Sequence, residues 1–239
     1  MNKAYLDTET GGFESKTDAL LQIALVPVID GERLPHFSSY MMPPSDLIIN
    51  DSALKVNGIK RIDIPSFKPE KDVLVDFCSY LEKLETKLTF TAFNAPFDLG
   101  FVKQWFLRNK MQSDFGYFFR PMICDVLKKA QDKKRYFPVR PENMKLTTLS
   151  ALFKIKHDGA HEALSDVLAM IDLDNILDSL GEQITPESKL SYRENCKKYL
   201  DSKYIIFNPD GDIFIQKNAV KDQNALRFIL NEMWEMYGQ

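Results

Sequence analysis

The sequence has few cysteines, little net charge and no long apolar run. Its 239 residues include three cysteines, Cys78, Cys124 and Cys196, which lie far apart and form no C-x-x-C pair. This spacing argues against a disulfide framework and against a zinc knuckle. The formal net charge of −3 argues against binding nucleic acid through overall basicity, so an anionic partner has to be met by local patches.

Membrane and secretory signals are also lacking. No apolar run approaches the roughly 18 residues that a membrane span requires, and a strand-like segment beginning at Lys3 leaves no room for a signal peptide. We therefore expect a cytoplasmic protein with no membrane partner. With 44% apolar and 27% charged residues, the composition is that of an ordinary globular protein with one large domain, or one domain and an appendage.

Residues 1–180 read as one α/β domain. Strand-like segments occur at 4–6 and 20–29, and Asp30-Gly31 predicts a tight hairpin into a returning strand at 33–42. Helical and strand-like patterns then alternate, at 73–84, 88–93, 96–106, 118–124, from 127 onward and at 163–180. Hairpin strands followed by this alternation predict a mixed sheet flanked by helices.

Residues 181–239 have a different character and predict a small C-terminal extension. Strand-like segments at 204–207 and 213–215 flank a turn-rich stretch, which predicts a hairpin, and 226–237 has the spacing of an amphipathic helix. A hairpin and one helix are too small to be stable alone. We expect the extension to dock on the main domain or on a second subunit; a homodimer and association with a polymerase both remain open.

Asp7 and Glu9 place two carboxylates on a strand otherwise suited to a core. Because side chains alternate along a strand, both point to the same side. Like charges so placed repel unless a cation lies between them, and oxygen ligands favour Mg²⁺ or Mn²⁺. Taken alone, the pair is a weak signal and is more typical of a strand that runs out into a polar loop.

Two further acidic positions follow strand or helix boundaries. Asp98 lies where a buried strand passes into a helix, a usual place for sites in open α/β sheets, although free backbone N–H groups also favour Asp there. Asp166 aligns with Met170 and Leu173 on a partly apolar helix stripe, where a carboxylate needs a partner or a metal.

His161 is the favoured histidine. Residues five apart on a helix are about 140° out of phase, so His161 should lie before or at the start of the helix that carries Asp166. A capping or surface histidine is the alternative. His36 and His157 have no acid-rich setting in the sequence.

These five residues resemble the motifs of the DEDDh 3′–5′ exonucleases, the DnaQ-like family with a ribonuclease H-like fold. Asp7 and Glu9 match its first motif, Asp98 its second, and His161 with Asp166 its third, H-x-A-x-x-D; the resemblance covers about residues 4–180. It implies two divalent cations, Mg²⁺ or Mn²⁺, with Asp7 bridging them and Glu9, Asp98 and Asp166 completing their shells. It also implies that His161 takes a proton from the attacking water.

The first motif resembles that of ribonuclease T, a member of this family, over residues 9–13 and 16–21. This resemblance implies that Phe13 and Phe97 stack on terminal bases and that Thr10 contacts substrate. Residues 53–59, including Asn57, match the segment that cradles the 3′ nucleotide. Val56 stands where ribonuclease T has a stacking phenylalanine.

Residues 128–145 carry seven lysines and arginines against two acids, with Tyr136 and Phe137 among them. This pattern fits a single-strand track that binds phosphates and stacks bases, and it fits a solvated helix face equally well. The resemblance implies a 3′–5′ exonuclease that releases 5′-mononucleotides from single-stranded 3′ ends, with DNA favoured over RNA, in proofreading or repair. The alternatives are a ribonuclease T-like exoribonuclease that trims RNA 3′ ends and a catalytically inactive nucleic-acid-binding module.

Overall fold

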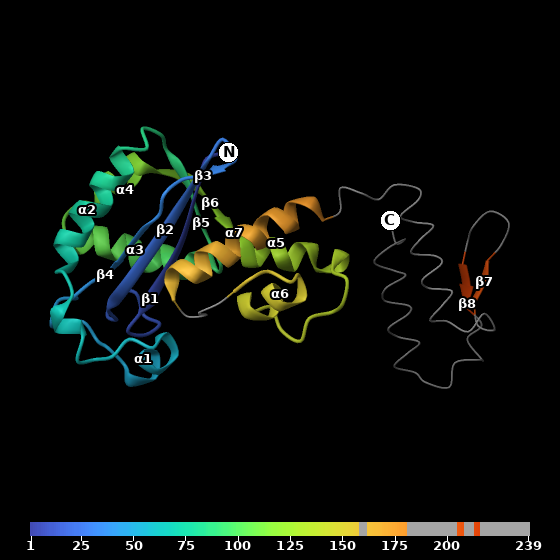
Figure 1. Cartoon of the computed structure of the whole chain (residues 1–239), viewed down its shortest axis with the longest axis horizontal. Coiled ribbons are helices and arrows are strands. Elements are labelled where there is room, and N and C mark those ends of the chain that lie inside the picture. Colours follow the sequence, from blue (N-terminus) through green and yellow to red (C-terminus); the bar gives the residue numbers. More distant parts are fainter. Residues whose placement is uncertain (158–161, 181–204, 208–212, 216–239) are drawn as a thin grey trace. The chain divides into compact units, whose positions relative to one another are not determined.

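The chain divides into two compact units, Met1–Glu182 and Gln183–Gln239. The computed structural model describes residues 1–157 and 162–180 of the first unit, and residues 205–207 and 213–215 of the second. The first unit holds one sheet with helices around it (Figure 1). The division into an exonuclease domain at 1–180 and an extension at 181–239 stays a prediction.

The sheet of the first unit is mixed, as the sequence predicts. Its strands run in the order β3-β2-β1-β5-β6. The remaining strand, β4, also pairs with β2, farther along the edge that pairs with β3. β1 is antiparallel to β2 and parallel to β5, which is parallel to β6. The strands are β1 (Lys3–Thr10), β2 (Leu20–Ile29), β3 (Glu32–Arg33), β4 (Phe37–Tyr40), β5 (Leu88–Ala92) and β6 (Phe119–Asp125). β1 is thus an inner strand, held on both sides.

The prediction of one returning strand at 33–42 is wrong in one respect, because this segment forms two short strands, β3 and β4. Pro35 lies in the break; it has no N–H with which to extend the ladder on β2. The Tyr80 hydroxyl donates a hydrogen bond to the Pro35 carbonyl. The predicted turn is present, with Asp30 and Gly31 at φ of 53° and 86°.

Helices cover both faces of the sheet. One core cluster joins the sheet to α2 (Glu70–Glu82), α3 (Ala95–Arg108) and α4 (Gln112–Phe118). The other joins it to α5 (Val126–Lys133), α6 (Leu146–Leu152) and α7 (Ala163–Ser179), and Figure 1 shows the two groups on opposite sides of the strands. Along β1, Ala4 and Leu6 enter the first cluster and Tyr5 the second. By the same alternation, Asp7 and Glu9 point to the side of α7.

Most predicted elements lie where the sequence places them. The patterns at 73–84 and 163–180 correspond to α2 and α7, and Pro96 lies in the first turn of α3. The sequence does not predict the short helices α1 (Asp51–Asn57), α4 and α6, nor the 3₁₀ turns η1 (Ile64–Ser66) and η2 (Lys134–Tyr136). Such short segments carry too few apolar residues to show a period.

In the second unit, β7 (Ile205–Phe207) pairs antiparallel with β8 (Ile213–Ile215), as predicted. The turn between them and the helix expected at 226–237 lie outside the described residues. Among the residues that are described, no helix combines the length and the apolar character needed to cross a bilayer.

Candidate active site

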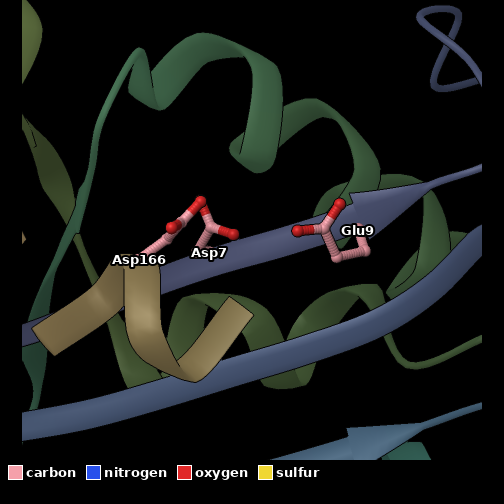
Figure 2. A group of neighbouring side chains, drawn as sticks. All are labelled: Asp7, Glu9 and Asp166. Atoms are coloured by element: carbon pink, nitrogen blue, oxygen red, sulfur yellow. The ribbon is translucent and has the colours of Figure 1, made fainter. Parts of the chain in front are cut away.

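Three carboxylates converge at the end of β1. Asp7 and Glu9 come from this inner strand, and Asp166 comes from the first turn of α7. One oxygen from each lies within 4.8 Å of those from the other two. Figure 2 shows the carboxylates of Asp7 and Asp166 next to each other, with Glu9 farther along the same strand. The structure therefore brings together three of the four acids that the sequence singles out as metal ligands.

Asp98 approaches from the other face of the sheet. A left-handed residue, Asn94 at φ 68°, turns the chain from β5 into α3, where Asp98 lies in the first turn and is 2% exposed. Thr8, between the two acids of β1, points to that face, and its hydroxyl donates a 2.7 Å hydrogen bond to Asp98 Oδ1. Asp98 is thus held beside the three-carboxylate cluster without belonging to it.

Crowding raises the proton affinity of these acids. Burial, followed by the charges of Asp98 and Asp166, raises the pKa of Asp7 well above its usual range. Burial and the same two neighbours raise the pKa of Glu9 to about 8. Burial raises the pKa of Asp98 to about 7, although the hydrogen bond from Thr8 works in the opposite direction. Each shift expresses the cost of placing unbalanced negative charge in a poorly hydrated site.

A divalent cation fits this donor set. Within residues 1–157 and 162–180, no lysine or arginine forms an ion pair with Asp7, Glu9, Asp98 or Asp166. Carboxylate oxygens are the ligands that Mg²⁺ and Mn²⁺ prefer, and a cation between them would remove the repulsion that raises their pKa values. The cluster of Asp7, Glu9 and Asp166 is therefore suited to a divalent metal.

His157 is a functional candidate that the sequence pattern does not reveal. Its Nε2 lies 2.5 Å from Asp166 Oδ1, and its side chain is 6% exposed, so it does have an acidic partner. His157 follows α6, and Asp166 lies nine positions later in the first turn of α7, so no single helical or strand period pairs them. His161, the predicted base, lies outside the described residues, and its role stays a prediction.

The two phenylalanines expected to stack on bases lie next to each other. Phe13 is 85% exposed, and its ring meets that of Phe97 edge-on with 6.5 Å between the centroids. Phe97 packs in turn on Phe101, at 5.1 Å. An exposed phenylalanine braced by a partly buried one is suited to stacking on a planar base.

Thr10 and Asn57 hold the loop that follows β1. The Thr10 hydroxyl donates to the Gly12 carbonyl at 2.7 Å, and the Asn57 amide donates to the Thr10 carbonyl at 3.2 Å. Gly12 is required here because a Cβ would lie 2.0 Å from an Asp18 carboxylate oxygen. These bonds join β1 to α1, and substrate contacts by Thr10 and Asn57 stay predictions.

The basic segment at 128–145 separates into two groups. Three lysines are engaged within the fold: Lys129 forms 2.5 Å ion pairs with Asp174 and Asp178, Lys133 donates to two backbone carbonyls, and Lys128 pairs with Asp132. The other four cations are exposed and form no ion pair with any described residue; they are Lys134, Arg135, Arg140 and Lys145. The guanidinium of Arg135 lies 4.8 Å from the centre of the Tyr136 ring. The lysines of α5 are thus engaged within the fold, and the single-strand track over the remaining cations stays a prediction.

Known proteins match most of this chain. The sequence model of the exonuclease family RNase_T matches residues 5–173. The 3′–5′ exonuclease DinG of Bacillus subtilis is 30% identical over 224 residues, covering 91% of this chain and 22% of DinG. The 3′–5′ DNA exonuclease Cap18 of Escherichia coli is 26% identical, covering 74% of this chain and 92% of Cap18. A PolC-type DNA polymerase III of Clostridium perfringens is 28% identical over 70% of this chain and 10% of its own length, so the chain spans a small part of DinG and PolC.

Solved structures share the fold. Exonuclease I superposes with a TM-score of 0.64 at 18% identity, over 82% of this chain and 44% of the other. The E. coli enzyme in complex with a dT13 oligonucleotide gives a TM-score of 0.65 at 17% identity, over 86% of this chain and 46% of the other. The predicted ribonuclease H-like sheet is thereby confirmed. With residues 5–173 matched and its acidic motifs in the predicted order, the chain belongs to the RNase_T exonuclease family, the DnaQ-like group that its sequence resembles.

Proposed function

We propose that this protein is a metal-dependent 3′–5′ exonuclease that removes 5′-mononucleotides from the 3′ ends of single-stranded DNA, in proofreading or repair. The observation that carries the proposal is the convergence of Asp7, Glu9 and Asp166 within 4.8 Å at the end of an inner strand. The names of the relatives, a 3′–5′ DNA exonuclease and DNA polymerases among them, support the polarity and the choice of DNA. Residues 1–180 would form the exonuclease domain.

The four acids would hold two Mg²⁺ or Mn²⁺ ions. Bound there, the ions would lower the energy of the charge that develops on the phosphate and its attacking and leaving oxygens. The family resemblance gives Asp7 the place shared by both ions, and the charges of Asp98, Asp166 and Glu9 all act on its carboxylate. Asp98, fixed by the Thr8 hydroxyl, would contribute from the opposite face.

His161 would accept a proton from the water that attacks the terminal phosphorus. The oxygen of that water forms the new bond to phosphorus while the bond from phosphorus to the 3′ oxygen of the preceding nucleotide breaks. The 3′ oxygen takes up a proton, which leaves a shortened strand with a 3′ hydroxyl and a free 5′-mononucleotide.

The strand would enter the site past Phe13 and Phe97, which stack on the terminal bases. The four free cations at 134–145 would bind phosphates farther along the strand. A single-stranded substrate is favoured because its 3′ end has to be threaded into the site. Discrimination between DNA and RNA would rest on contacts to the 2′ position of the sugar, and a matched RNA substrate tests it.

The proposal is tested with one single-stranded DNA labelled at either end. In the presence of Mg²⁺, a 5′ label should give a ladder of shortening products, and a 3′ label should appear at once as mononucleotide. Chelator and an Asp7→Asn variant should each abolish both patterns. A matched RNA degraded faster than the DNA would favour the exoribonuclease reading, and binding without metal-dependent cleavage would favour the inactive module.

Residues 181–239 are proposed as an interface for self-association or for a polymerase. Light scattering on the full chain tests the first: a dimer mass that falls to a monomer mass on deletion of 181–239 supports self-association. A monomer mass for the full chain contradicts it.

A further inference from the structure

His157 is directed at one of the predicted metal ligands. Its Nε2 lies 2.5 Å from Asp166 Oδ1. Since a carboxylate oxygen can only accept, Nε2 carries the proton and donates. The other ring nitrogen, Nδ1, is buried and has no hydrogen-bond partner in the part of the chain that the structure describes. Asp166 is therefore the hydrogen-bond partner of this buried ring among the described residues.

The contact is compatible with a converged ligand set. With His157 bonded to one oxygen of Asp166, the three carboxylates still lie within 4.8 Å of one another. A carboxylate has a second oxygen and further lone pairs to offer a cation. His157 therefore does not act as a latch that draws Asp166 out of the site.

Asp166 has no other side-chain support among the described residues. The arrangement parallels that of Asp98, whose carboxylate accepts a 2.7 Å hydrogen bond from the Thr8 hydroxyl. A hydrogen bond from outside the coordination shell fixes the orientation of a ligand and so avoids the loss of entropy when metal binds. The two acids that come from helices, α3 and α7, thus each accept a hydrogen bond from a neighbouring side chain.

We propose that His157 is a positioning residue for the metal site: its Nε2–H holds the Asp166 carboxylate in the orientation that binds a divalent cation. This inference rests on the proposed function, since it gives Asp166 the role of a ligand. It assigns to His157 a part distinct from that of His161, which would act on the water.

The direct test is Mn²⁺ binding, followed by the electron paramagnetic resonance signal of free Mn²⁺ at constant pH, without substrate. His157→Ala should weaken binding by about 10- to 100-fold. His157→Gln, whose amide can donate from a similar position, should recover most of the affinity. His36→Ala is the matched control, because His36 is exposed, and it should leave binding unchanged.

Wild-type Mn²⁺ affinity in folded His157→Ala would overturn the proposal, and so would equal losses in the alanine and glutamine variants. If His157 served only to stabilise the fold, His157→Ala would lower the melting temperature and leave the Mn²⁺ affinity of the folded protein unchanged. At saturating Mn²⁺, kcat of His157→Ala should recover towards wild type. Should the wild type leave every labelled strand intact while Mn²⁺ binding depends on His157, the proposed function fails and the positioning role stands.

Discussion

Raising the pH in the absence of divalent metal should destabilise this protein, because its acidic site must then ionise without a counter-ion. The pKa of Glu9 is raised from 4.5 to about 8 by burial and by its acidic neighbours. Between those two values the folded state binds more protons than the unfolded state, so the free energy of unfolding falls as pH rises. The contribution of Glu9 is fully present below its unfolded pKa and is lost as the pH passes through about 8.

The expected size follows from the pKa values. A difference of one bound proton changes the free energy of unfolding by about 1.4 kcal/mol per pH unit. Between about pH 5.5 and 7.5, Glu9 alone should then cost about 2–3 kcal/mol. Asp98, whose pKa is raised to about 7 mainly by burial, adds a smaller loss over the same range. For a domain of this size, a loss of about 3 kcal/mol lowers the melting temperature by roughly 5–10 °C.

The assay is thermal unfolding by circular dichroism across this pH range, in chelator and in excess Mg²⁺. Mg²⁺ should raise the melting temperature, and more so at the higher pH, because ionised carboxylates bind the cation and binding stabilises the folded state. Glu9→Gln should flatten the pH dependence in chelator. Glu32→Gln, on the exposed strand β3, is the matched control and should leave it unchanged. A melting temperature in chelator that does not fall with pH would refute the electrostatic reasoning.

Three further predictions test other parts of the structure. Phe13→Ala should raise KM for single-stranded DNA, because it removes a stacking contact that contributes about 1–3 kcal/mol to binding. The melting temperature should not change, since Phe13 is exposed, and Tyr117→Ala, at another exposed aromatic residue, should leave KM unchanged. Arg135→Gln should reduce the slope of log affinity against log salt by about 0.7 if Arg135 binds a phosphate, whereas Lys128→Gln, already paired within α5, should not. Asp174→Asn should lower the free energy of unfolding by about 3–5 kcal/mol, measured by urea titration, without weakening Mn²⁺ binding; unchanged stability would contradict the assigned ion pairs.

The sequence predicts the fold well wherever a segment is long and patterned. β2 is buried along nearly all of its length, and α2 and α7 present apolar residues at helical spacing, so their places follow from period alone. It misses α1 and α4, which have seven residues each, and the break at Pro35. Those features depend on tertiary contacts, such as the hydrogen bond that the Tyr80 hydroxyl makes across the chain to Pro35.

The site is predictable in part for a related reason. Asp7 and Glu9 share a side because a strand alternates, and their meeting with Asp166 follows once α7 covers that side. The partner of His157 could not be predicted from the sequence, since His157 lies outside the helix that carries Asp166 and shares no period with it. Likewise, only the structure separates Lys129, which is engaged with Asp174, from the free cations of the same segment.

A comparison with Asp174, another acid of α7, shows what distinguishes the carboxylate cluster at the end of β1 from an acid that only stabilises the fold. Asp174 lies two turns beyond Asp166, fully buried, and meets Lys3, Lys129 and the Tyr5 hydroxyl at 2.5–2.6 Å. Although burial alone would raise its pKa, these donors hold it below the usual value. At the other end of the same strand and helix, Asp7 and Glu9 have no lysine or arginine partner in the described part of the chain, and their pKa values rise. The fold thus balances a buried acid where it serves only stability, and leaves its acids unbalanced where a cation is to bind.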